Sequence, residues 1–174
     1  MSTTVYVGID NGVTGSIAAV DATGKVIKFC AMPTFKVQDY TKKKKRITRV
    51  DTRPLISIFN SFIQYAGTPT EVRVFVERPM INPQRFIATT SALRALEATL
   101  IILEHGRLAY RFLDSREWQS IMLPQGIKGA DDLKRASLER GLRLYTYPAL
   151  VAAITKQKDA DSLLMAEAAR KEHW

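Results

Sequence analysis

The stretch that decides the fold is Thr4-Val5-Tyr6-Val7-Gly8-Ile9-Asp10, a short β-branched and apolar run that ends on a carboxylate. This composition predicts a core β-strand. Asn11-Gly12 follows as a turn, and two more strand-like runs come at 16–20 and 25–31. Short strands separated by turns that contain glycine predict an antiparallel meander of three strands.

Beyond Pro33 the apolar period changes from two residues to 3.6. We expect segment 36–49 to form a long basic connection and Thr52-Arg53-Pro54 to open a helix. The predicted apolar face of this helix consists of Leu55, Ile56, Phe59, Phe62 and Ile63. A second helix is predicted over 86–105, with an apolar stripe of Leu93, Leu96, Leu100 and Leu103.

Two further strands are predicted at 71–77 and 108–113, on either side of the second helix. The remainder is helical in character, with a short piece at 116–122, another at 131–140 and a final helix that begins near Asp159. Three antiparallel strands followed by strands that alternate with helices predict an α/β fold. Its mixed five-stranded sheet, with three antiparallel strands and then two parallel ones, would be flanked by helices.

Size and composition predict one globular domain over residues 1–174, with 46% hydrophobic and 25% charged residues. No apolar run approaches the roughly 20 residues that span a bilayer, so no membrane partner is expected. The chain enters its first strand without a secretory leader, which predicts a cytoplasmic protein. Cys30 is the only cysteine, and His105 and His173 have no companion pattern, so the chemistry is expected to come from carboxylates.

A net charge of +9 predicts a polyanionic partner, with nucleic acid before a membrane surface. Between positions 36 and 53, two acids face eight cations, which are Lys36, Lys42, Lys43, Lys44, Lys45, Arg46, Arg49 and Arg53. A solvated loop would explain an isolated run of lysines. On a chain that is basic throughout, contact with phosphate is the better interpretation.

Four carboxylates fall at the ends of predicted core elements: Asp10, Glu77, Asp159 and Asp161. If the first and fourth strands are parallel neighbours, Asp10 and Glu77 emerge side by side at the edge where α/β sheets bind their ligands. Oxygen ligands without histidine or thiolate suit Mg²⁺ or Mn²⁺, and two such ions can catalyse phosphodiester hydrolysis. Each acid also has a structural alternative, namely a hairpin turn at Asp10, a solvated strand end at Glu77 and a helix cap at Asp159.

Three motifs together resemble the RuvC family of Holliday-junction resolvases. Val7-Gly8-Ile9-Asp10-Asn11-Gly12, continued by Thr14-Gly15-Ser16-Ile17-Ala18, resembles the family's first-strand Asp and its glycine-rich turn. Phe75-Val76-Glu77-Arg78-Pro79 is similar to the fourth-strand Glu, and 158–166 (KDADSLLMA) is similar to the terminal motif. Arg116-Glu117-Trp118-Gln119 resembles a segment of phage-type members. The motifs follow the family's order across nearly the whole chain.

The resemblance implies a ribonuclease-H-like fold and a crossover junction endodeoxyribonuclease. Two Mg²⁺ ions, replaceable by Mn²⁺, would be held by Asp10, Glu77, Asp161 and Asp159, and hydrolysis would leave 5′-phosphates. A homodimer would nick opposite strands of a four-way junction, in the cytoplasm of a bacterial or phage-infected cell. One departure is that the terminal acids are two residues apart instead of three or four. Because such a pair does not share a helix face, Asp161 is the better match and Asp159 would have to lie in a non-helical cap.

Candidate DNA contacts are basic residues that would hold the backbone without reading its sequence. They are Lys42, Lys43, Lys44, Lys45, Arg46, Arg85, Lys128, Lys134, Arg135, Lys156 and Lys158. Phe86, at a helix entry, would stack on a base at the branch point. Its alternative role is a hydrophobic staple for that helix.

Three other functions stay open. A fragment of an actin-like kinase or ATPase would share the first motif, but 174 residues cannot close two such domains around a nucleotide. A non-catalytic protein that binds branched DNA would use the acids structurally. A ribonuclease H, or another nuclease for branched DNA or RNA–DNA hybrid, would use the same fold on a different substrate.

Overall fold

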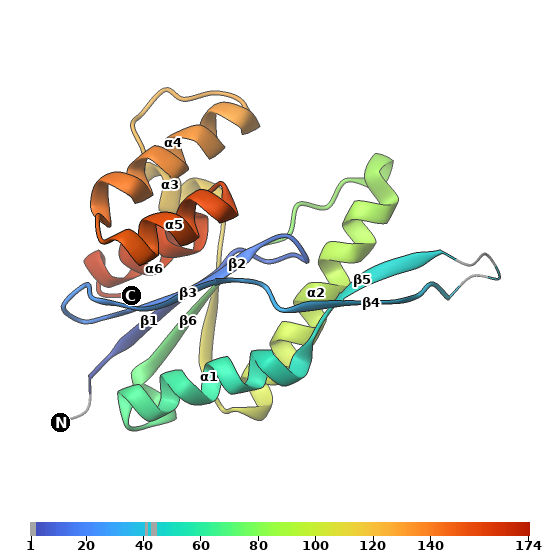
Figure 1. Ribbon diagram of the computed structural model, residues 1–174, viewed down its shortest axis with the longest axis horizontal. Coiled ribbons are helices and arrows are strands. Elements are labelled where there is room, and N and C mark those ends of the chain that lie inside the picture. Colours follow the sequence, from blue (N-terminus) through green and yellow to red (C-terminus); the bar gives the residue numbers. More distant parts are fainter. Residues whose placement is uncertain (1–2, 41, 43–44) are drawn as a thin grey trace.

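The computed structural model describes residues 3–40, 42 and 45–174. Its elements follow in the order β1 (Val5–Ile9), β2 (Ser16–Asp21), β3 (Val26–Ala31), β4 (Thr34–Gln38), β5 (Arg46–Val50), α1 (Thr52–Ala66), the 3₁₀ turn η1 (Pro69–Glu71), β6 (Val72–Glu77), the 3₁₀ turn η2 (Pro83–Arg85), α2 (Phe86–His105), β7 (Ala109–Leu113), α3 (Ser115–Met122), α4 (Ala130–Leu144), α5 (Pro148–Gln157) and α6 (Asp161–Lys171) (Figure 1).

The main sheet has five strands in the order β3-β2-β1-β6-β7. β1 pairs antiparallel with β2, and β2 pairs antiparallel with β3. β1 and β6 are parallel, as are β6 and β7, so the predicted mixed sheet is confirmed. Since Ile9 lies opposite Val76, the residues that follow each of them, Asp10 and Glu77, leave the sheet at the same edge.

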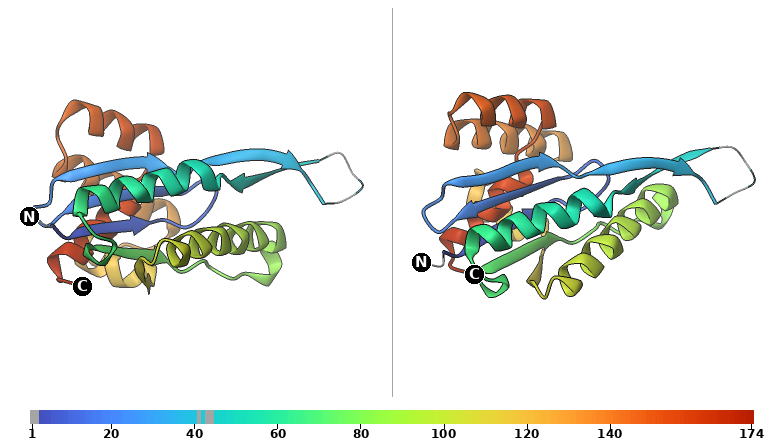
Figure 2. Two further views of the ribbon diagram at one scale, coloured as in Figure 1. Left: turned by 90° about the horizontal axis from the view of Figure 1, so that it is seen from below. Right: turned by 60° about the horizontal axis from the view of Figure 1, so that its bottom comes forward.

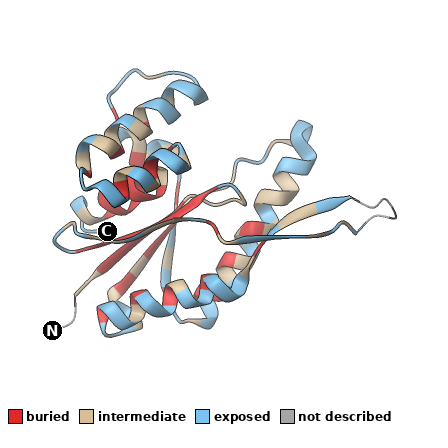
Figure 3. Ribbon diagram, in the orientation of Figure 1, coloured by how far each residue is buried: buried red, intermediate tan, exposed pale blue. Residues whose placement is uncertain are grey.

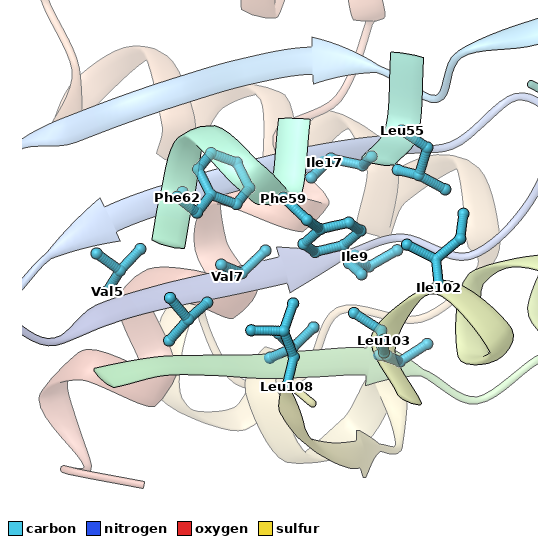
Figure 4. Packing of buried hydrophobic residues seen from close by; sticks show 14 of the residues in the cluster. Val5, Val7, Ile9, Ile17, Leu55, Phe59, Phe62, Ile102, Leu103 and Leu108 are labelled. Atoms are coloured by element: carbon cyan, nitrogen blue, oxygen red, sulfur yellow. The ribbon is translucent and has the colours of Figure 1, made fainter. Parts of the chain in front are cut away.

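Helices cover both faces of this sheet (Figures 1 and 2). β1 is buried along its whole length because it contributes side chains to both faces (Figure 3). Val5, Val7 and Ile9 pack with the α1 residues Phe59 and Phe62 (Figure 4). Tyr6 packs on the opposite face, in a second cluster formed mainly by α3 to α6. A strand apolar on both sides is typical of a sheet covered by helices on both sides.

Two of the predicted apolar helix faces are partly wrong. In α1, Leu55, Phe59 and Phe62 are buried as expected, but Ile56 is 41% exposed. In α2, Leu93 is 43% exposed, and the buried positions are Ala95, Thr99, Ile102 and Leu103. The Thr99 hydroxyl is satisfied by donating to the carbonyl of Ala95, so this small, partly polar face can pack closely against the sheet. Of the leucines on which the prediction relied, Leu103 is buried, Leu96 and Leu100 are partly buried and Leu93 is exposed.

Segment 83–105, which includes α2, is by length and composition the one described helix that could cross a membrane. This corrects the expectation that no apolar run is long enough. The buried positions of α2 belong to the core cluster under the sheet. Three of its other apolar residues, Ile87, Leu93 and Ile101, are exposed.

The predicted connection 36–49 is wrong in its conformation, because it is a β-hairpin. β4 and β5 pair antiparallel as a separate two-stranded sheet, with Val37 opposite Ile47. In both strands apolar residues alternate with polar ones, which is the two-residue period of a β-strand. The run of lysines between the strands made this period hard to recognise in the sequence. The predicted DNA contacts Lys43 and Lys44 lie outside the described residues.

The helix α5 was not predicted, and α4 extends to Leu144, beyond its predicted end. Pro148 occupies the first turn of α5, where its missing N–H costs nothing, and Leu150 and Ile154 are buried. α5 ends at Gln157, and its C-cap Lys158 has a left-handed conformation (φ 68°) that turns the chain toward Asp159. This turn determines where the last acids lie.

Candidate metal centre

Asp10 lies directly after β1, in the six-residue turn that leads to β2. Its backbone N–H donates to the carbonyl of Ser16 (3.0 Å), so the turn is longer than the tight hairpin turn considered as an alternative for Asp10-Asn11-Gly12. Gly15 packs against the Asp10 backbone so closely that a Cβ at this position would collide with the carbonyl oxygen. The glycine-rich sequence is therefore required to fold the chain around Asp10.

The start of α6 is brought to Asp10 by a close helix–strand contact. A Cβ at Gly8 would collide with the Ser162 carbonyl, so glycine is needed where α6 crosses β1. The hydroxyls of Ser16 and Ser162 share a buried hydrogen bond of 2.7 Å, which joins β2 to the first turn of α6. Since α6 begins at Asp161, these contacts place that carboxylate next to the end of β1.

Asp159 precedes the helix and is not its N-cap, which is Ala160. Because the chain turns between the end of α5 and the start of α6, Asp159 and Asp161 both lie close to Asp10. Ligand oxygens of Asp10, Asp159 and Asp161 lie within 4.8 Å of one another. The non-helical position anticipated for Asp159 is therefore present, which resolves the conflict between an i, i+2 spacing and one shared site.

Glu77, the last residue of β6, borders this cluster. Its Oε1 accepts a hydrogen bond from the indole Nε1 of Trp118 (3.1 Å), a residue of α3 that is fully buried. Glu77 is also close enough to Asp10 for its charge to raise the pKa of Asp10. The Trp118 contact fixes the orientation of Glu77 at the edge of the cluster.

The acids are electrostatically unfavourable together. Burial raises the pKa of Asp10 well above its usual value, and the charges of the neighbouring acids Glu77, Asp161 and Asp159 raise it further. Burial also raises the pKa of Asp161 to about 7, although a hydrogen bond with Ser137 opposes the shift. The pKa of Asp159 is raised by burial as well. Ionising all of these groups together requires a compensating positive charge.

The cluster fits a divalent cation. All of its candidate ligands are carboxylate oxygens, which Mg²⁺ and Mn²⁺ prefer. Asp159 is only 7% exposed, and its Oδ1 has no hydrogen-bond partner among the described residues. A buried oxygen of this kind would gain a partner as a metal ligand. The site can therefore hold metal, with Asp10, Asp159 and Asp161 as ligands and Glu77 beside them.

Comparison with solved structures identifies the fold. The chain is similar to T. thermophilus RuvC in complex with a Holliday junction substrate, with a TM-score of 0.54 and 12% identity over 98% of this chain and 95% of that chain. The fold is that of RuvC. It confirms the predicted ribonuclease-H-like architecture. A second structure, of Thermus thermophilus RuvC, matches with a TM-score of 0.49 and 14% identity over 97% of this chain and 96% of the other. No family model and no curated protein matches the sequence.

The predicted DNA contacts fall in five places on this RuvC-like fold. Lys134, on α4, is near enough to Asp159 and Asp161 for its charge to lower the pKa of both, against the raising effect of burial. Lys158 is exposed at the end of α5, and Lys156 is exposed on the helix's last turn. The others lie elsewhere in the fold. Lys128 and Arg135 line a groove beside α4, Lys42, Lys45 and Arg46 lie on the β4–β5 hairpin, and Arg85 lies in η2.

Arg85 lines a groove of about 350 Å³ that begins at Glu77 and runs between Asn11 and the start of α2. Phe86, the first residue of α2, is 73% exposed at this end of the molecule. The alternative that it packs as a hydrophobic staple is therefore wrong. The groove reaches Glu77 at the carboxylates, and Phe86 follows Arg85 directly in the chain.

Sequence reasoning assigned no role to several residues that shape the site. Trp118 orients Glu77, and its only signal was its place in a segment that resembles phage-type RuvC proteins. Asn11 donates through Nδ2 to the Ala92 carbonyl (3.2 Å), which ties the Asp10 turn to α2. Gln157 donates to the carbonyls of Thr14 and Gly15, which ties the same turn to α5. These contacts join residues more than 40 positions apart, so no local pattern could identify them.

Proposed function

We propose that this chain is a metal-dependent endonuclease that resolves four-way DNA junctions. The observation that carries the proposal is the cluster of Asp10, Asp159 and Asp161, with oxygens within 4.8 Å of one another, at the carboxyl edge of a RuvC-like sheet. Glu77 completes a set of four acids without histidine or thiolate. Such a set suits hydrolysis of a phosphodiester without a protein nucleophile.

The proposed reaction adds water to phosphorus and breaks the bond to the 3′-oxygen, which leaves a 5′-phosphate and a 3′-hydroxyl. Two Mg²⁺ ions would lower the pKa of the attacking water and stabilise the leaving oxygen. Asp10, Asp159 and Asp161 would hold one ion, and Asp10 with Glu77 the second. Lys134 would hold a neighbouring phosphate, since its charge already acts on two of these acids.

Branched DNA is the proposed substrate because a basic, open site adjoins an exposed aromatic ring. Arg85 lies in the groove beside Glu77, where it would hold a backbone phosphate. Phe86 would stack on a base that is unpaired at the branch point. The similar RuvC structure is a complex with a Holliday junction, which supports the same substrate class.

A panel of labelled substrates tests this function. In the presence of Mg²⁺ we expect paired, symmetric nicks in a four-way junction, and much slower cleavage of a replication fork, linear duplex or RNA–DNA hybrid of the same sequence. Cleavage of the hybrid alone would instead identify a ribonuclease. Binding of the junction without cleavage in Mg²⁺ or Mn²⁺ would identify a non-catalytic DNA-binding protein.

A homodimer is proposed as the working form, and the exposed apolar face of α2 is its proposed interface. Ile87, Leu93 and Ile101 lie exposed on this helix, together with Met80 and Ile81 in the preceding loop. Large exposed apolar residues that lie together are typical of an interaction surface. Two active sites related by two-fold symmetry would suit the two strands cut in a junction.

Ile101→Glu tests the dimer interface, because this side chain is 58% exposed and its loss should leave the core intact. We expect the wild-type protein to have the mass of a dimer in light scattering, and the variant that of a monomer. Paired cutting should change to single nicks. Gln64→Glu on the exposed side of α1 is the matched control and should leave the dimer unchanged. A wild-type monomer, or a variant that stays dimeric, would contradict the assignment.

A further inference from the structure

The β4–β5 hairpin has two different faces. Because Phe35 pairs with Arg49 and Val37 with Ile47, these four side chains share one face. The opposite face consists of Thr34, Lys36, Gln38, Arg46, Thr48 and Val50. At its centre Lys36 lies opposite Thr48, and Gln38 lies opposite Arg46. This second face, which we call the basic face, contains no acid.

The first face is directed toward α2. Arg49, which belongs to the first face, lines a groove together with Tyr40 and with the α2 residues Arg94 and Ile101. The first face therefore lies toward this helix. The guanidinium of Arg94 lies over the ring of Tyr40, 5.7 Å from its centroid, and this contact holds the far part of the hairpin near α2. Lys36 and Arg46, on the other face, are exposed, whereas Val50 at the base of that face is buried in the core.

The cations of the hairpin keep their charge available. Among the described residues, no salt bridge involves Lys36, Lys42, Lys45 or Arg46, and all four are exposed. The described part of the hairpin holds more cations than acids, and like charges repel one another. A polyanion placed along the basic face would remove that repulsion.

The hairpin begins beside the carboxylate site. Met32, just before β4, donates its backbone N–H to the carbonyl of Gly15 (2.9 Å), in the turn that surrounds Asp10. From there β4 and β5 extend beyond the main sheet and away from the helices α3 to α6 (Figures 1 and 2). A rigid polyanion that starts at the acids and leaves the molecule on this side would run along the hairpin.

We propose that the β4–β5 hairpin is a DNA-binding arm whose basic face holds the phosphate backbone of one duplex arm, away from the bond that is cut. The proposal rests on DNA being the substrate and adds a second contact region to the catalytic centre. Phosphate contacts position the duplex and contribute most of the salt-dependent affinity. A two-stranded ribbon is also narrow enough to follow a groove of the duplex.

The test compares two double variants with the same change of charge. Lys36→Glu with Arg46→Glu reverses the basic face, whereas Lys25→Glu with Lys28→Glu reverses two exposed lysines of the β2–β3 hairpin. Lys25 lies at the other end of the sheet, since Asp21 pairs with Val5 at the start of β1. Both variants alter exposed side chains, and circular dichroism should show unchanged folding.

Affinity for a four-way junction should fall on the order of tenfold in the basic-face variant. The slope of log affinity against log salt concentration should be smaller in magnitude by roughly two, because about 0.9 counterion is released per phosphate contact and two contacts are lost. The control variant should keep both the affinity and the slope within twofold. Equal affinity and slope in both variants would overturn the proposal.

Junctions with progressively shortened arms locate the contact. The difference between the wild-type and basic-face variant affinities should disappear once the arms are too short to reach the hairpin. A difference that persists on the shortest arms would place these residues at the branch point and overturn the assignment to a duplex arm. If the wild-type protein binds the junction tightly but does not cleave it, the proposed catalytic function fails while the arm remains supported.

Discussion

Replacing Asp10 by Asn is expected to reduce Mg²⁺-dependent cleavage of a four-way junction by at least about 10³-fold, or about 4 kcal/mol of transition-state stabilisation. Asp10 interacts with each of the other acids: its oxygen lies near those of Asp159 and Asp161, and the charge of Glu77 raises its pKa. An amide has a similar shape but no charge, and it would bind a divalent ion weakly. Single-turnover cleavage measures the loss.

DNA binding by the Asp10→Asn variant should be retained or improved, because one negative charge is removed from a site that receives phosphate. Glu172→Gln is the matched control, since Glu172 is exposed just beyond the far end of α6 and should cleave like the wild type. Retained cleavage by Asp10→Asn would show that this cluster is not the catalytic site. Loss of both binding and folding, seen by circular dichroism, would show that the charge is needed structurally.

The main sheet was predictable because its strands have simple local patterns. β1 is a short apolar run rich in β-branched residues. Asp51 caps α1, because its side chain accepts a hydrogen bond from the Arg53 N–H. The hairpin was missed because its alternation contains lysines where a buried strand would have apolar residues. The buried face of α2 was predicted incorrectly because it contains the small residues Ala95 and Thr99, which let the helix pack closely on the sheet.

In the candidate site too, the positions set by neighbouring strands could be predicted from the sequence, whereas those set by tertiary packing could not. Asp10 and Glu77 could be paired from sequence, because parallel neighbouring strands bring their carboxyl ends to one edge. The position of Asp159 could not be, since it depends on the left-handed turn at Lys158 and on α5, which has little pattern of its own. The interaction of Trp118 with Glu77 depends on tertiary packing alone.

Asp159→Asn should separate the metal role of this residue from a structural one. Its buried carboxylate has an unpartnered Oδ1, and burial raises its pKa. A raised pKa in the folded state means that the folded protein binds the proton more tightly than the unfolded chain does. The ionised group therefore costs stability, and that cost grows as pH rises from about 4, the value in the unfolded chain. With Asp161 near 7, the metal-free protein should lose stability from pH 4 to above pH 7.

At pH 8 without metal, Asp159→Asn should therefore raise the melting temperature by roughly 2–4 °C, or about 1 kcal/mol, and at pH 4 the two proteins should melt alike. Added Mg²⁺ should stabilise the wild type more than the variant, because the ion compensates a charge that the variant lacks. Cleavage by the variant should fall on the order of 10²-fold. A melting temperature lowered at pH 8, with the response to Mg²⁺ unchanged, would mean that Asp159 supports the chain before α6 and does not bind metal. If instead stability rises while cleavage is lost, the carboxylate is retained at a cost to stability because it serves the reaction.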